Sequence, residues 1–73
     1  MEDYKDSLKF LISKVKYDKI SAGFANFLNH QYGNVIEEGK ILQYTFCDGD
    51  SLSDVKKFFE KYYPDLCDEL FAS

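Results

Sequence analysis

The sequence predicts a mainly helical single domain over residues 1–73, with three to four helices and one short β-hairpin or strand. Apolar residues recur at spacings of three and four in three separate stretches, as they do on one face of a helix. Only residues 41–46 are dense in β-forming side chains. Seven Phe and six Tyr among 73 residues supply the apolar area that a small core needs. An α+β class is the alternative.

The first predicted helix begins near Tyr4 and extends to about residue 17. Asp6 lies in its first turn, and Lys14 and Lys16 lie near its end, where their charges complement the helix dipole. Phe10 and Tyr17 fall on another side and give the helix a second, narrower apolar edge. The main apolar face, at spacings of four, three and four, consists of Tyr4, Leu8, Leu11 and Val15.

The second helix is predicted to begin at Asp18 or Ser21 and to end near Tyr32. Gly33 and Asn34 follow it, and both residue types tolerate the left-handed conformation that is common at helix ends. Because the link between the first two helices is short, we expect them to pack as an antiparallel pair or at a steep angle.

Residues 35–46 predict a short hairpin, or one strand after a loop. The stretch 37–40 contains Gly39 and is typical of a turn. Leu42, Tyr44 and Phe46 alternate along the chain and would share one face of a strand. A two-stranded ribbon is marginal by itself, so we expect this segment to lie against the helices.

The third helix is expected to follow Ser51, which together with Asp54 resembles a capping box. It should end at Tyr63, because a proline disfavours helical geometry in the residue before it. Pro64 suits the first position of a short last helix.

The apolar faces of these elements together define the expected core, with Phe58 at the edge of the third helix's inward face. The last helix is expected to present an apolar face of its own, formed by Leu66, Cys67, Leu70 and Phe71. The predicted core consists of Leu8, Leu11, Val15, Ile20, Phe24, Phe27, Leu42, Tyr44, Phe46, Val55, Phe59, Tyr62 and Leu70.

The net charge of −4 lies in the last third of the chain. Residues 1–47 hold six acids and six lysines, whereas residues 48–73 hold seven acids and three lysines. This sign argues against nucleic acid and anionic membranes as partners, and no apolar run approaches the ~20 residues of a membrane span. Two cysteines and an acidic rather than signal-like start predict a cytoplasmic protein with reduced thiols.

No motif predicts a metal site, a cofactor or a catalytic centre. Asp48, Asp50 and Asp54 gather three carboxylates in seven residues, but their spacing fails the calcium-loop pattern and fits a turn before a capped helix. His30 with Cys47 or Cys67 assembles no nucleophile, base and orienting group. Acidic neighbours should raise the pKa of the Cys67 thiol, and Cys47 is expected to be a small core residue. We therefore expect no enzyme and no small-molecule substrate.

The alternative to a protein-binding function is a helix-turn-helix-like regulator that binds nucleic acid through residues 14–31. That stretch offers Lys14, Lys16 and Lys19 to phosphates, and the amides of the second helix to base edges. The sequence pI of about 4.7 and the lack of arginine argue against it. Mimicry of DNA by the acidic residues 48–69 is a weaker alternative, since three lysines interrupt that run.

The favoured function is a small, acidic, non-enzymatic module that binds a protein partner or itself. Aromatic residues are enriched at interfaces, and four of the rings fit the core pattern poorly: Phe10, Tyr17, Phe58 and Tyr63. These four are the predicted partner-binding residues, with the acidic C-terminal third steering a basic partner. Lysine in place of arginine, with many Asn, Ile, Tyr and Phe, suggests AT-rich coding DNA. An inhibitor or accessory protein of a low-GC bacterium or its mobile element is one concrete version.

Overall fold

The computed structural model describes residues 4–71, which form four helices and one antiparallel β-hairpin. The mainly helical class is confirmed, and the β segment is a hairpin rather than a lone strand. In chain order the elements are α1 (Tyr4–Ser13), α2 (Ala22–Tyr32), β1 (Asn34–Glu37), β2 (Lys40–Gln43), α3 (Leu52–Tyr62) and α4 (Pro64–Phe71).

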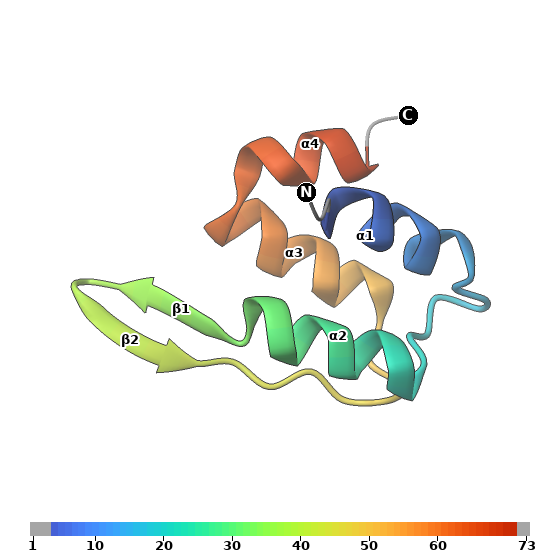
Figure 1. Ribbon diagram of the computed structural model, residues 1–73, viewed down its shortest axis with the longest axis horizontal. Helices are drawn as coiled ribbons and strands as arrows, with labels where there is room; N and C mark the ends of the chain where they lie inside the picture. Colours follow the sequence, from blue (N-terminus) through green and yellow to red (C-terminus); the bar gives the residue numbers. More distant parts are fainter. Residues whose placement is uncertain (1–3, 72–73) are drawn as a thin grey trace.

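The helices surround one apolar core, and the hairpin extends beyond them at one end (Figure 1). In the view of Figure 1, α3 lies between α4 above and α2 below, and α1 and α2 run in opposite directions. The buried core residues are Leu8, Ile20, Phe24, Ala25, Leu28, Val35, Phe46, Val55, Phe58, Phe59 and Cys67. Most of the predicted core is therefore confirmed as buried or as packed against these residues.

Helix α1 ends at Ser13, about one turn earlier than the sequence predicts. The Ser13 hydroxyl donates to the Phe10 carbonyl over 2.6 Å, and the amides of Lys14 and Val15 donate to carbonyls only three residues back. Such local bonds close the last turn and compete with further helix. Lys16 and Tyr17 consequently lie in the link to α2 rather than on a helix.

Helix α2 has a serine cap but no left-handed end. Ser21 accepts a hydrogen bond from the Phe24 amide, as an N-cap should. Gly33 has φ −69°, so the expectation of a left-handed residue there is wrong. Glycine is needed for another reason, because a Cβ at this position would overlap the Asn29 carbonyl oxygen.

The hairpin pairs Val35 with Leu42 and Ile36 with Ile41 around a two-residue turn. Both turn residues, Glu38 and Gly39, have positive φ, which is the geometry that matches the twist of the flanking strands. Val35 is buried, but its partner Leu42 is exposed, and so is Tyr44. The prediction that Leu42 and Tyr44 belong to the core is wrong: the ribbon that carries Leu42 extends past the helices, and Tyr44, which follows the ribbon, packs on Phe46 and Phe58 with its other side exposed.

Helices α3 and α4 begin and end as the sequence predicts, with Pro64 at the first position of α4. Ser51 caps α3 but accepts from the Ser53 amide, and its hydroxyl donates to Asp18 instead of completing a capping box with Asp54. Cys47 is exposed, so the prediction that it is a small core residue is wrong, whereas Cys67 is buried. Within residues 4–71, no helix is long and apolar enough to cross a membrane.

Candidate functional site

The link between α1 and α2 contains a tight turn whose two central residues are both left-handed. Tyr17 has φ 57° and Asp18 has φ 61°, and the Lys19 amide donates to the Lys16 carbonyl over 3.1 Å. Neither residue is glycine, so each left-handed conformation costs about 1–2 kcal/mol. Such strain persists only where the surrounding structure fixes the backbone.

Segment 49–52 provides that support through hydrogen bonds to Asp18 and Ile20. The Ile20 amide donates to the Asp50 carbonyl, and the Gly49 amide donates to the Ile20 carbonyl, each over 2.9 Å. On the other side, the Leu52 amide donates to the Asp18 carbonyl over 3.0 Å. The Ser51 hydroxyl donates to the Asp18 carboxylate over 2.7 Å. The N-terminus of α3 and the turn thus hold each other in place.

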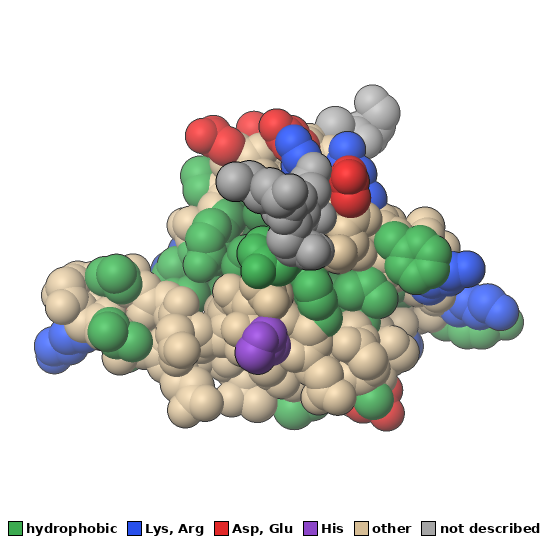
Figure 2. Space-filling model, viewed as in Figure 1, with side chains coloured by type: hydrophobic (Ala, Val, Ile, Leu, Met, Phe, Trp, Pro, Cys, Tyr) green, Lys and Arg blue, Asp and Glu red, His purple; other side chains and the backbone are tan. Residues whose placement is uncertain are grey.

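The turn presents an aromatic ring among lysines. Tyr17 is 92% exposed, and Lys16 and Lys19 flank it. The Lys14 ammonium lies 5.1 Å from the centre of the Phe10 ring, which is itself 60% exposed. We call this group the Tyr17 surface: Phe10, Lys14, Lys16, Tyr17 and Lys19. Figure 2 shows lysines beside hydrophobic side chains at the end of the molecule where this link lies.

The three lysines also converge on a shallow groove of about 190 Å³. Lys14, Lys16 and Lys19 line it together with apolar residues of α1 and α2, among them Leu11 and Phe24. The carboxylate closest in sequence, Asp18, is already bonded to Ser51. An anionic group approaching this groove would therefore meet several ammonium groups and an apolar floor.

The structure separates the four predicted partner-binding residues. Phe10 and Tyr17 lie at the surface, whereas Phe58 is 3% exposed and Tyr63 is half-buried. The Phe58 ring lies within 5.0 Å of three other ring centres, those of Tyr44, Phe46 and Tyr62. Phe58 was expected to lie outside the core, and this is wrong because residues 44–46 cover that side of α3.

Tyr63 belongs to the same ring cluster. Its ring centre is 5.3 Å from that of Tyr32, in an edge-to-face arrangement. Burial raises the pKa of the Tyr32 hydroxyl, and the neighbouring hydroxyls of Tyr63 and Tyr4 raise it further. Tyr63 is thus a packing residue that keeps one side accessible.

Sequence reasoning missed the role of Asn29. Its side-chain amide donates to the Phe46 carbonyl over 2.8 Å and accepts from the Phe46 amide over 2.6 Å. Asn29 therefore holds the chain that returns from the hairpin, in the way a neighbouring strand would. The sequence gives no signal for this pairing, which spans 17 residues. Because its amide is bonded to Phe46, Asn29 is not free to contact bases. Asn26 and His30 on the same helix are exposed.

The acidic side chains gather elsewhere, over α4 (Figure 2). Asp65, Asp68 and Glu69 are exposed there, and Glu69 pairs with Lys5 over 2.7 Å. Phe10 and Tyr17 thus have lysines as neighbours, although segment 49–52, which belongs to the acidic last third, binds the turn that carries Tyr17.

In the part of the chain that the structure describes, no group of three or more His, Cys, Asp or Glu side chains is placed to hold a metal ion. Burial raises the pKa of the Cys67 thiol, and Glu60 and Asp68 raise it further, in the direction the sequence predicts. Its hydrogen-bond partner is the Lys56 carbonyl, 3.8 Å away.

No family model, no curated protein and no solved structure matches this chain.

Proposed function

We propose that this protein is a small, non-enzymatic interaction module that binds an acidic segment of a partner protein through the Tyr17 surface. The observation that carries the proposal is the Tyr17 ring, 92% exposed on a strained turn; two hydrogen bonds from Asp18 and two from Ile20, which follows the turn, hold this stretch to segment 49–52. A backbone held in place before binding loses little conformational entropy when a partner covers the ring that it carries. Tyrosine is among the residue types most enriched at binding hot spots.

The charge beside the ring selects the partner. Lys14, Lys16 and Lys19 favour carboxylates, although the whole chain carries a net charge of −4. The partner is therefore acidic where it meets this surface, instead of the basic partner that net charge alone suggests. The free thiols of Cys47 and Cys67 are in keeping with a reducing, cytoplasmic location, which is part of the proposal. An inhibitor or accessory role in a low-GC bacterium or its mobile element also stays part of it.

An NMR titration with the peptide acetyl-Glu-Glu-Phe-Glu-Glu-amide tests the proposal. We expect saturable shifts of backbone amides in residues 10–21, which weaken as salt is added. Tyr17→Ser should lower the affinity about fivefold or more, as loss of a hot-spot ring does. Ile41→Thr is the matched control, because Ile41 is 75% exposed on the distant hairpin, and it should leave the affinity unchanged. Shifts confined to other residues, or an unchanged affinity of Tyr17→Ser, would contradict the proposal.

Nucleic-acid binding is the second candidate, because lysines alternate with exposed rings on the same surface. Single-stranded nucleic acid stacks its bases on such rings. The Asn29 amide is engaged by Phe46, which argues against a helix-turn-helix reader. A short oligothymidine and a DNA duplex are therefore titrated in parallel. Tighter binding of either than of the acidic peptide, lost when Lys14, Lys16 and Lys19 are changed to Gln, would replace the protein-binding proposal.

Self-association is a version of the same proposal, in which the acidic face of α4 supplies the carboxylates. Sedimentation equilibrium decides it. A monomer at all concentrations removes this version and leaves the binding of another protein untouched.

A further inference from the structure

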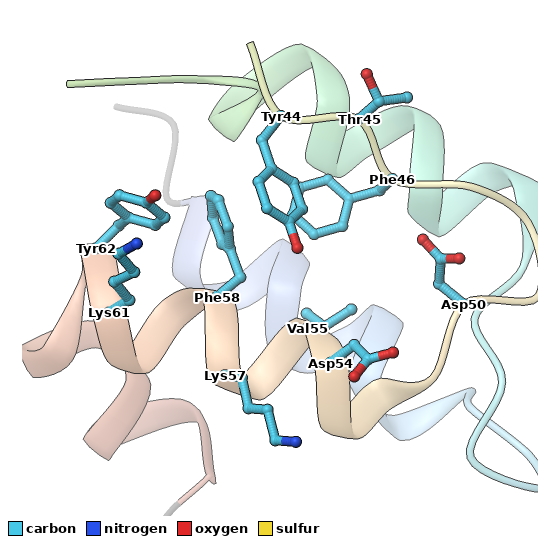
Figure 3. Close-up of a pocket in the computed structure, with 10 residues that line it drawn as sticks. All are labelled: Tyr44, Thr45, Phe46, Asp50, Asp54, Val55, Lys57, Phe58, Lys61 and Tyr62. Atoms are coloured by element: carbon cyan, nitrogen blue, oxygen red, sulfur yellow. The ribbon is translucent and has the colours of Figure 1, made fainter. Parts of the chain in front are cut away.

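A second groove, separate from the Tyr17 surface, lies between segment 44–50 and α3 (Figure 3). It has a volume of about 490 Å³. The rings of Tyr44, Phe46 and Phe58 form its inner wall, with centres 4.7–4.9 Å apart, and Val55 lies beside them. Tyr44 is 40% exposed, so its ring is the one that solvent reaches. The groove therefore offers the Tyr44 ring, backed by the buried rings of Phe46 and Phe58, to an incoming group.

Two carboxylates stand at one end of this groove. Figure 3 shows Asp50 and Asp54 on the side away from Lys61 and Tyr62. One Asp50 oxygen accepts from the Cys47 amide over 2.8 Å, and the other oxygen makes no hydrogen bond within residues 4–71. The Asp54 carboxylate has no ion-pair partner among these residues. Negative charge without a matching cation thus lies next to the exposed aromatic wall.

The lysines that line the groove do not neutralise this end. Lys61 is engaged at the other end, where its ammonium lies 2.7 Å from the Glu37 carboxylate. The side chain of Lys57 points away from the rings in Figure 3. The acidic end is consequently the part of the groove that a ligand cation would complement.

We propose that this groove binds an arginine side chain from a basic segment of a partner protein. A guanidinium group is planar, so it stacks on aromatic faces, and its fork of N–H groups bonds carboxylates at its edge. Tyr44 with Asp50 and Asp54 provides both kinds of partner. Lysine has a compact ammonium that uses only part of this arrangement. The chain itself contains no arginine, so the ligand has to come from a different protein and not from a second copy.

The test is an NMR titration with acetyl-Ala-Ala-Arg-Ala-Ala-amide up to about 10 mM, the range in which a single side chain binds. Peptides with citrulline and with lysine in place of arginine serve as comparisons, since citrulline keeps the shape and loses the charge. We expect saturable shifts at residues 44–46 and 54–58, strongest for arginine, weaker for lysine and weakest for citrulline.

Two variants sharpen the result. Asp54→Asn removes one carboxylate charge from an exposed side chain and should lower the arginine affinity about two- to fivefold. Glu60→Gln, which removes an exposed carboxylate of the same helix that does not line this groove, is the matched control and should leave the affinity unchanged. The absence of saturable shifts at these residues, equal binding of arginine and citrulline or of arginine and lysine, or an unchanged affinity of Asp54→Asn would overturn the proposal. Because none of these peptides is acidic, none of these results depends on the Tyr17 surface binding an acidic partner.

Discussion

The molecule has two tight turns of the same backbone geometry at opposite ends, and they are stabilised in different ways (Figure 1). In the Tyr17–Asp18 turn both residues are left-handed although neither is glycine. In the hairpin the equivalent residues are Glu38 and Gly39, with φ 54° and 78°. The hairpin turn thus has a glycine at one of its two strained positions and needs less external support.

The two turns also differ in the side chains that they expose to solvent. The Tyr17 turn and the Ile20 that follows it are bound to segment 49–52 by two hydrogen bonds each, and the turn presents a ring beside lysines. The hairpin exposes an uncharged cross-strand pair, Ile36 and Ile41, whose side chains are 73% and 75% exposed. Strain at the Tyr17 turn is therefore maintained by tertiary bonds, which is typical of sites where position matters more than local stability.

The largest effect is expected from Asn29, which anchors the chain returning from the hairpin. Asn29→Ala removes both bonds to the Phe46 backbone and leaves a part-buried amide and carbonyl unpaired. The free energy of unfolding should fall by about 2–3 kcal/mol, as measured by urea denaturation. Asn26→Ala, on the exposed side of the same helix, corrects for the helix propensity that alanine adds. Equal stabilities of the two variants would show that Asn29 does not hold the hairpin end in place.

The two turns themselves can be compared by exchanging glycine between them. Tyr17→Gly relieves left-handed strain and loses few contacts, so it should raise the stability by roughly 0.5–1 kcal/mol. Gly39→Ala adds strain where no atom would touch the new Cβ, and should lower the stability by about 1 kcal/mol. Thermal denaturation resolves both, since 1 kcal/mol shifts the Tm of a domain this size by about 4–8 °C. A Tyr17→Gly variant that is less stable than the parent would show that the left-handed conformation of Tyr17 does not strain the turn.

The comparison also shows what the sequence could predict. The period of apolar residues and the residues Ser21, Gly39, Ser51 and Pro64 predict the helices and the hairpin, because these signals act over a few neighbouring positions. The Tyr17 turn could not be predicted, since its bonds come from residues some 30 positions away and its residues disfavour positive φ.

The same limit applies to the candidate site. Phe10 and Phe58 both lie off the predicted apolar faces, yet one is exposed and the other buried. What separates them is whether another segment covers them, and only Phe58 meets the rings of Tyr44 and Phe46. The spacing of apolar residues within one helix does not indicate which of its side chains another segment will cover.

The smallest effect concerns the bond that joins the hairpin to α3. The Glu37 carboxylate accepts from the Tyr62 hydroxyl over 3.2 Å and pairs with Lys61 over 2.7 Å. The hydrogen bond from Lys61, helped by that from Tyr62, lowers the pKa of Glu37, and the same pairing raises the pKa of Lys61. A carboxyl group with a lowered pKa stabilises the fold above its unfolded pKa, about 4.3 for glutamate. That contribution is lost as the pH falls through the lower, folded value.

The loss should be small, because the pair is exposed to solvent and screened by salt. Urea denaturation at steps between pH 7 and pH 3 should show a slightly flatter acid limb for Glu37→Gln than for the parent. Lys61→Met should flatten the same limb, since the group that lowers the pKa is gone. Glu38→Gln, the neighbouring turn residue, is the control and should keep the parent's pH dependence. If Glu37→Gln and the parent lose stability in parallel down to pH 3, the bonds of Glu37 to Tyr62 and Lys61 do not stabilise the fold. The hairpin is then held by Asn29 and the Val35 contacts alone.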